Sequence, residues 1–207
     1  MNDTYTITDE SQLDAIIGEP MDFVRVKIAS HLDEVMKAFI ARSPLIFVST
    51  IDTHGHVDVS PKGDPGGFVQ VDDRGNLLIP ERPGNKLSFG FRNILRNGQI
   101  GLIFVVPNQR ETLRVKGLAS LHNDPDLLNL MRVNDKPALL YTCVEVRECF
   151  FHCGKALIRS KLWQPEFWDN TAESLGARQF SSLSGGSEDA YNATMERLEK
   201  SYRDELY

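Results

Sequence analysis

The pattern of apolar positions changes near residue 43, from helical spacing before it to mainly alternating segments after it. Within residues 22–42, apolar side chains recur every three or four positions, which predicts one helix. That helix should end before Pro44, because the proline ring disfavours a helical conformation in the preceding residue. Residues 9–17 predict a shorter helix. Residues 1–42 are therefore expected to form a helical segment that packs on the domain after it.

From residue 45 onward, short alternating segments predict β-strands rather than helices. The first two pairs of strands are predicted hairpins, because each pair flanks a turn rich in Gly, Asn or Asp. The alternation stops briefly near Arg147 and Glu148, which predicts an interruption in the last strand region. The predicted strands are residues 45–50, 57–60, 68–71, 77–80, 100–106, 112–121, 138–148 and 149–158.

Two helices are predicted among these strands, at residues 85–97 and 124–133. Regular alternation of strands and helices would indicate a parallel sheet, and that pattern is absent. No G-x-G-x-x-G motif joins a strand to a helix, which disfavours a Rossmann domain. The predicted fold class is therefore mainly β, a six- to seven-stranded antiparallel barrel with flanking helices over residues 43–168. Residues 169–207 are expected to form a flexible linker and a polar C-terminal helix.

Composition narrows the kinds of partner. The chain has 207 residues and a formal net charge of −6, and nucleic-acid binding needs a basic face, so nucleic acid is not an expected partner. No run of roughly 18 apolar residues predicts a membrane-spanning helix. The first residues lack the basic start and apolar stretch of a secretion signal, which indicates a cytoplasmic protein.

The cysteines are Cys143, Cys149 and Cys153, and an odd count without a secretion signal indicates reduced thiols. Cys149, His152 and Cys153 are close enough in sequence to suggest a metal site. However, a continuous strand would place the two cysteines on one face and His152 on the other. Zinc sites also usually draw a second pair of ligands from elsewhere in the chain. The pattern therefore favours free cysteines in a β-core over a metal.

Hydrogen-bond donors suited to an anion gather in two segments of this acidic chain. In the first segment, Ser60 and Lys62 flank Pro61, which should end the strand and project the lysine beyond the sheet. The glycines of the next residues, Gly63-Asp-Pro-Gly-Gly, allow a ligand or a partner chain to lie close to the backbone. The alternative is a solvated lysine before a tight turn.

The second segment is the turn Arg82-Pro-Gly-Asn85 and the helix that it opens. Asn85 is a good N-cap, and the first turn of a helix leaves unpaired N–H groups that attract a phosphate. Arg82 and Lys86 would add charge-assisted hydrogen bonds at the same place. The alternative is an ordinary capped helix with solvated basic flanks. Taken together, the two segments favour a site for one small phosphorylated ligand.

The succession of these motifs resembles the pyridoxamine 5'-phosphate oxidase-like split-barrel proteins, which bind FMN. The resemblance covers roughly residues 25–168. It is carried by Ser60-Pro-Lys-Gly-Asp-Pro, Ile79-Pro-Glu-Arg-Pro-Gly-Asn-Lys, Arg92-Asn-Ile-Leu, Glu111-Thr-Leu-Arg-Val-Lys-Gly and Cys149-Phe-Phe-His-Cys-Gly-Lys. It implies a homodimer of split barrels with one FMN in each of two clefts at the subunit interface. The implied phosphate ligands are Ser60, Lys62, Arg82, Asn85 and Lys86, and the implied flavin-side contacts are Val59, Pro61 and Phe68.

The segment from Lys155 to Trp163 could approach the flavin of the other subunit. Arg159 and Trp163 lie four residues apart and would share one face of a helix. The alternative is a snorkelling cation and a half-buried tryptophan that closes the barrel. Near the C-terminus there is no convincing equivalent of the full substrate-binding motif of true pyridoxamine 5'-phosphate oxidases, which argues against vitamin B6 oxidation.

The resemblance implies an FMN-dependent oxidoreductase that acts on an unidentified small molecule, with the flavin carrying the redox chemistry. No catalytic side chain is assigned, because His54 and His56 lie in a turn, and Asp58 and Asp64 have no identifiable partner in the sequence. Three alternatives stay open. They are a flavin-binding or flavin-storage protein without turnover, a haem-binding relative on the same barrel, and pyridoxamine 5'-phosphate oxidase itself.

Overall fold

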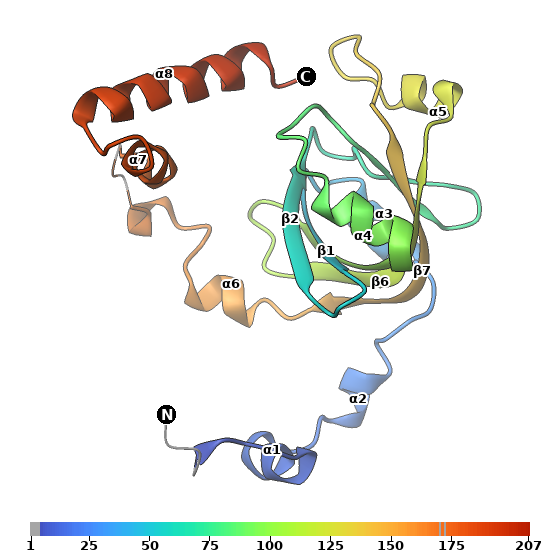
Figure 1. Ribbon diagram of the computed structural model, residues 1–207. Helices are drawn as coiled ribbons and strands as arrows, with labels where there is room; N and C mark the ends of the chain where they lie inside the picture. Colours follow the sequence, from blue (N-terminus) through green and yellow to red (C-terminus); the bar gives the residue numbers. More distant parts are fainter. Residues whose placement is uncertain (1–4, 170, 172) are drawn as a thin grey trace.

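The computed structural model describes residues 5–169, 171 and 173–207 (Figure 1). The helices are α1 (Glu10–Ile17), α2 (Asp22–Arg25), α3 (Glu34–Ile40), α4 (Phe89–Asn97), α5 (Pro125–Leu130), α6 (Lys155–Arg159), α7 (Leu175–Ser182) and α8 (Glu188–Asp204). The strands are β1 (Leu45–Ile51), β2 (Val57–Gly63), β3 (Gln70–Val71), β4 (Leu77–Pro80), β5 (Gln99–Val105), β6 (Thr112–His122) and β7 (Tyr141–His152). Across the described residues, no helix is both long enough and apolar enough to span a membrane.

The seven strands form one sheet in the order β2-β1-β5-β6-β7-β4-β3, and all neighbouring strands are antiparallel. This confirms the predicted mainly β, antiparallel architecture. The sheet curls (Figure 1), so that its β2 edge approaches the segment that follows β4. There Lys62 of β2 forms an ion pair with Glu81, the residue directly after β4. Side chains rather than a backbone ladder therefore close the sheet on this side.

The hydrophobic core lies between the curled sheet and the helices α3 and α4. Met36, Phe39 and Ile40 of α3 are buried in it, together with apolar side chains from β1, β5 and β6. Asn93 of α4 is also buried, and its side-chain nitrogen donates to Thr50 Oγ1 of β1 over 3.1 Å. This bond fixes α4 beside the strands that carry the candidate site.

The single helix predicted for residues 22–42 is wrong, because the chain breaks it into α2 and α3. Between these helices, the backbone of Ala29 pairs with Cys149 of β7 through two hydrogen bonds of 3.0 and 2.8 Å. Asp33 then starts α3 by accepting from the backbone N–H of Met36. Helical spacing could not reveal a strand partner 120 residues away. Moreover, α1 buries none of its residues, and Figure 1 shows it away from the sheet, so within residues 5–42 the packing on the barrel comes mainly from α3.

β7 is one strand with an irregularity where the sequence predicted an interruption. The register shifts so that Lys116 pairs with Glu148 while Gly117 pairs with Val146, which leaves Arg147 as a bulge. A Cβ atom on Gly117 would lie 2.2 Å from the carbonyl oxygen of Glu145, so this bend requires glycine. The predicted strand over residues 149–158 is wrong beyond His152, because α6 begins at Lys155.

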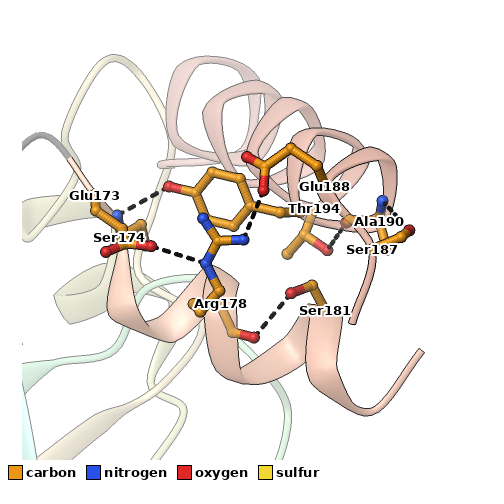
Figure 2. A network of polar contacts seen from close by, with 9 residues as sticks. Glu173, Ser174, Arg178, Ser181, Ser187, Glu188, Ala190 and Thr194 are labelled. Atoms are coloured by element: carbon orange, nitrogen blue, oxygen red, sulfur yellow. Dashed lines mark hydrogen bonds and ion pairs between the residues drawn. The ribbon is translucent and has the colours of Figure 1, made fainter. Parts of the chain in front are cut away.

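The C-terminal segment is a helical hairpin, whereas a linker and one helix were predicted for residues 169–207. Residues 175–182 form α7, which the sequence analysis missed, and Gly185 and Gly186 turn the chain with positive φ angles. Arg178 of α7 joins the two helices by an ion pair to Glu188 of α8 (3.0 Å), and it also pairs with Glu173 just before α7 (2.8 Å), as Figure 2 shows. Asn170 and Ala172 of the predicted linker lie outside the described residues.

Candidate functional site

A cavity of about 700 Å³ opens between β2, the segment after β4 and the start of α4. Its apolar floor comes from the core side of the sheet and from α4, and its polar rim comes from β2 and from residues 81–88. Of the ten residues that the sequence singled out, the structure brings eight to this cavity: Val59, Ser60, Pro61, Lys62, Phe68, Arg82, Asn85 and Lys86.

The polar residues of β2 reach the cavity because side chains alternate along a strand. Asp58, Ser60 and Lys62 are half-buried on the cavity side, whereas the side chains of Val57 and Val59 are exposed on the other side, although Val59 also borders the cavity. The strand continues through Pro61 to Gly63, so the predicted strand end at Pro61 is wrong. Proline is tolerated because β2 is an edge strand that pairs only with β1. Lys62 consequently faces the cavity from within the sheet.

Lys62 is held between an acid and an aromatic ring. Its Nζ lies 2.6 Å from Glu81 Oε2 and 4.9 Å from the ring centroid of Phe91 in α4. Both partners line the cavity, so the ammonium group stays at the rim. An ammonium group in this position can attract an anionic ligand, but Glu81 already neutralises much of its charge.

Arg82 forms the second ion pair of the rim. Its Nε donates to Asp64 Oδ2 over 2.7 Å, and its Nη2 donates to the carbonyl oxygen of Met131 over 2.7 Å. The side chain of Asp64 is only 1% exposed and that of Arg82 is 13% exposed. The third guanidinium nitrogen, Nη1, is buried and has no hydrogen-bond partner among the described residues. The site therefore contains one buried donor that lacks an acceptor.

We call the two ion pairs Lys62–Glu81 and Arg82–Asp64 the seam. They cross, since the basic residue belongs to β2 in one pair and to the segment after β4 in the other. The sequence analysis found the cations but missed these pairings. Both acids lie beside the cations in sequence, but only the curling of the sheet brings the two segments together.

The helix start predicted at Asn85 is wrong, because α4 begins at Phe89 with Ser88 as its N-cap. Lys86 and Ser88 have φ angles of 61° and 57°, in the left-handed region, which interrupts any helix before residue 89. Asn85 instead accepts from the backbone N–H of Leu87 over 3.0 Å within the loop. Ser88 makes no side-chain capping bond. The loop and the start of α4 line the cavity, and the exposed Lys86 forms no ion pair within the described chain.

The other two predicted site residues do not line this cavity. Arg159 is exposed at the end of α6. Trp163 is half-buried, and its indole Nε1 donates to the carbonyl oxygen of Gln109 over 2.8 Å. In the single chain, this bond fastens Trp163 to the loop between β5 and β6.

The cysteines lie apart from the cavity. Cys149 is fully buried, and burial raises the pKa of its thiol, whereas Cys143 is half-buried and Cys153 is exposed. In the described part of the chain, no group of three or more His, Cys, Asp or Glu side chains is placed to hold a metal ion.

Comparison with known proteins identifies the family. The family described as pyridoxamine 5'-phosphate oxidase matches residues 32–153, more than half of the chain. The chain belongs to the pyridoxamine 5'-phosphate oxidase family. The matched residues contain every strand and the whole wall of the cavity. Within this family member, Arg159, Trp163 and the α7–α8 hairpin lie outside the matched segment.

No curated protein matches the chain. Among solved structures, HupZ of Group A Streptococcus is similar, with 19% identity, a TM-score of 0.47 and coverage of 58% of this chain and 93% of that one. General Stress Protein 26 of Bacillus anthracis has 14% identity, a TM-score of 0.43 and coverage of 55% and 88%. HutZ of Vibrio cholerae, described as a haem storage protein, has 15% identity, a TM-score of 0.38 and coverage of 58% and 94%.

Proposed function

We propose that the cavity binds FMN and that the protein is an FMN-dependent oxidoreductase acting on a small molecule. The observation that carries the proposal is a cavity lined by Ser60, Lys62, Arg82 and Lys86, together with a buried nitrogen of Arg82, Nη1, that has no hydrogen-bond partner among the described residues. A buried donor without an acceptor is costly, and a phosphate oxygen of a bound ligand would satisfy it. Membership of the pyridoxamine 5'-phosphate oxidase family supports a phosphorylated flavin as that ligand.

The dimensions and polarity of the cavity fit a ligand with one anionic end and one flat apolar body. Its volume of about 700 Å³ lies within the range of roughly 300–1,000 Å³ that small-molecule pockets occupy. Asp58 and Lys62 are four residues apart on one strand face, so the polar side is about 13 Å long. The opposite wall is apolar and includes Ile79, Ile94 and Ile100. A phosphate at the seam would leave the ring system against this wall.

The rim carries equal numbers of positive and negative side chains, and this determines which cations would be free to bind a phosphate. Lys62, Arg82 and Lys86 supply three positive charges, while Asp58, Asp64 and Glu81 supply three negative ones. Two of the cations are already paired in the seam. An incoming phosphate would therefore share Lys62 and Arg82 with their carboxylates and take the exposed Lys86 as its unshared cation.

Bound FMN would supply hydride or electron transfer, and the chain would supply binding and orientation. Phe91 and the isoleucines would keep water away from one face of the ring. Ser60, on the same strand face as Lys62, would donate to the phosphate or the ribityl chain. Because the flavin would carry the redox chemistry, the cavity would need no nucleophilic side chain.

The cavity favours flavin over haem. Proteins hold haem iron through His, Cys, Met or Tyr, and none of the described residues that line the cavity is of these types. Among the described residues, the wall of this cavity therefore offers no ligand for a haem iron, unlike what a haem storage protein would need.

We also propose that the protein is a homodimer that associates through the outer face of its sheet. This outer face consists of Phe47, Val57, Val59, Ile103 and Leu118, all exposed on the side of the sheet away from the core. Five exposed apolar side chains on neighbouring strands are unusual for a monomer surface and are typical of an interface. A second copy fits this surface, because the family resemblance implies flavin clefts at a subunit interface.

The absorbance spectrum of the purified protein tests the proposal. We expect a flavin spectrum, release of FMN on denaturation, and reduction of the bound flavin by a nicotinamide donor. A colourless protein that fails to take up added FMN would refute the cofactor, and a Soret band would replace it with haem. Bound FMN that no donor reduces would favour storage over turnover. Oxidation of pyridoxamine 5'-phosphate by the loaded protein would identify the true oxidase activity.

A further inference from the structure

Tyr207 lies at the seam although it is separated from it by more than 120 residues of sequence. Its hydroxyl donates to Asp64 Oδ1 over 2.9 Å. The carbonyl oxygen of Tyr207 accepts from Nζ of Lys136, in the loop between α5 and β7. In Figure 1 the chain after α8 turns back toward the barrel, consistent with these contacts. The C-terminal hairpin is thus tied to the wall of the cavity by a half-buried side chain.

The contact continues through Asp64 to the unpaired donor of the cavity. Asp64 accepts from Tyr207 with one carboxylate oxygen and from Arg82 with the other. The carbonyl oxygen of Met131 accepts from Nη2, so Nε and Nη2 of Arg82 are both held, and Nη1 is the guanidinium nitrogen that has no partner among the described residues. The orientation of Nη1 therefore depends on where Asp64 points, and one of the two bonds that orient Asp64 comes from Tyr207.

The pKa of Tyr207 agrees with this arrangement. The hydrogen bond to Asp64 raises the pKa of the phenol above its ordinary value, and burial adds to the shift. The phenol accordingly stays protonated and keeps donating to the carboxylate at neutral and moderately alkaline pH.

We propose that Tyr207 is a positioning residue of the ligand site, which sets the Arg82 guanidinium through Asp64 for an anionic group of the ligand. The proposal rests on the proposed function in one respect, namely that the ligand carries a phosphate. It adds a residue outside the family segment, which ends at residue 153, to the phosphate site. The α7–α8 hairpin is then part of the site rather than an appendage of the barrel.

A comparison of FMN with riboflavin tests this role in the full chain. Riboflavin lacks the phosphate, so a residue that acts through Arg82 on the phosphate should affect only FMN. In Tyr207→Phe we expect the Kd of FMN, measured by flavin fluorescence quenching, to rise about ten-fold, while the Kd of riboflavin stays unchanged. Tyr202→Phe is the matched control, because Tyr202 lies on α8, is 62% exposed, and its hydroxyl makes no hydrogen bond within the described residues.

Two outcomes of that titration would overturn the proposal. An equal loss of affinity for both flavins would show that Tyr207 only stabilises the fold, and unchanged FMN binding would show that it does not act on the site. If the wild type binds neither flavin, the proposed function fails, and the positioning role is decided without ligand. Hydrogen exchange at Arg82 Nε, assigned with Arg82→Lys, should then be at least about ten-fold faster in Tyr207→Phe than in the wild type. Equal exchange rates would refute the positioning role.

Discussion

The side of β2 that lines the cavity carries Asp58, Ser60 and Lys62, whereas its outer side carries Val57 and Val59, which are 65% and 61% exposed. A strand with one face on the core usually has the opposite arrangement, with apolar side chains inside and polar ones outside. The neighbouring strand β1 shows the ordinary inner face, since Ile46 and Val48 are buried. The inversion is therefore specific to the edge strand at the cavity.

The difference between the two sides of β2 matches the two surfaces proposed above, one for a ligand and one for a second copy of the chain. Polar side chains on the inner side remain hydrated in an open cavity and are available to a polar ligand. Apolar side chains on the outer side gain by leaving water, which a second copy would permit. Because side chains alternate with a period of two, a substitution at Val57 changes only the outer side and one at Lys62 changes only the inner side, whereas Val59 borders both.

The largest expected effect is on association through the outer face. Ile103 lies directly opposite Phe47 at the centre of this face. Replacing Ile103 with Asp would bury an unpaired charge in the proposed interface. We therefore expect the Kd of the dimer to rise at least about a hundred-fold. Analytical ultracentrifugation measures this shift. Val35→Asp is the control, because Val35 is an exposed apolar residue of α3 outside this face.

A dimeric Ile103→Asp variant with wild-type affinity would contradict the assignment of the outer face. The same variant also tests whether FMN binding on the inner side of β2 depends on association through the outer side. If FMN is held at the subunit interface, the monomeric variant should lose FMN as well. If its FMN affinity is unchanged, each cavity binds FMN with its own chain alone.

The next effect is on the inner side of β2. Lys62→Ala should weaken FMN binding about ten- to one-hundred-fold, because it removes one charge-assisted hydrogen bond to the phosphate. Isothermal titration calorimetry measures the affinity. Lys37→Ala is the matched control, since Lys37 also forms an ion pair, to Glu34, but lies on α3. The double variant Lys62→Ala with Glu81→Gln separates loss of the phosphate contact from the cost of an unpaired Glu81. Wild-type affinity in both variants would place the phosphate elsewhere.

Much of the fold follows from local chemistry that the sequence displays. Alternation and turn residues such as Gly75-Asn76 locate the strands, and Asp124-Pro125 locates α5 with its cap. Errors occur where a distant partner or an unusual backbone angle decides the structure. Ala29 leaves the predicted helix to pair with Cys149, and the positive φ of Ser88 delays α4 until Phe89. Neither event has a local signal in the sequence.

The candidate site was predictable as a set of residues but not as a set of interactions. Lys62 and Arg82 stand out because cations and glycines cluster in an acidic chain. Their partners Glu81 and Asp64 become visible only when β2 and the segment after β4 meet. Tyr207 had no signal at all, since a terminal tyrosine after a polar helix is an ordinary sequence feature. The net charge around the site depends on which side chains the fold brings together. The sequence alone therefore predicted a more cationic site than the structure contains.

The balance of charges around the cavity leads to a prediction opposite to that for Lys62→Ala, namely tighter rather than weaker FMN binding. Glu81→Gln keeps a hydrogen-bond acceptor for Lys62 but removes the negative charge that competes with a phosphate. We expect FMN to bind roughly three- to ten-fold more tightly at low ionic strength, and the gain should shrink as salt screens the charges. Titrations at two salt concentrations measure both effects. Weaker binding in this variant would mean that Glu81 positions Lys62 for the ligand rather than competing with it.

The smallest effect concerns the turn that joins β1 to β2 and belongs to neither binding surface. The carboxylate of Asp52 accepts from the backbone N–H groups of His54 (2.7 Å) and His56 (2.9 Å), and the bond from His56 contributes most to lowering its pKa from 3.8 to about 2. A lowered pKa in the folded state means that the carboxylate stabilises the fold above its ordinary pKa. This contribution is lost as the pH falls through about 2.

Asp52→Asn cannot titrate, so it should be less stable than the wild type at about pH 5, and the difference should narrow towards about pH 2. Urea unfolding across this range measures it. Because Asp52 lies in a surface turn with its side chain partly exposed, the difference will be small, and FMN affinity and dimerisation at neutral pH should match those of the wild type. A stability difference that stays constant with pH would mean that the carboxylate charge contributes nothing to the turn. A change in FMN affinity would mean instead that the geometry of β2 at the cavity depends on this turn.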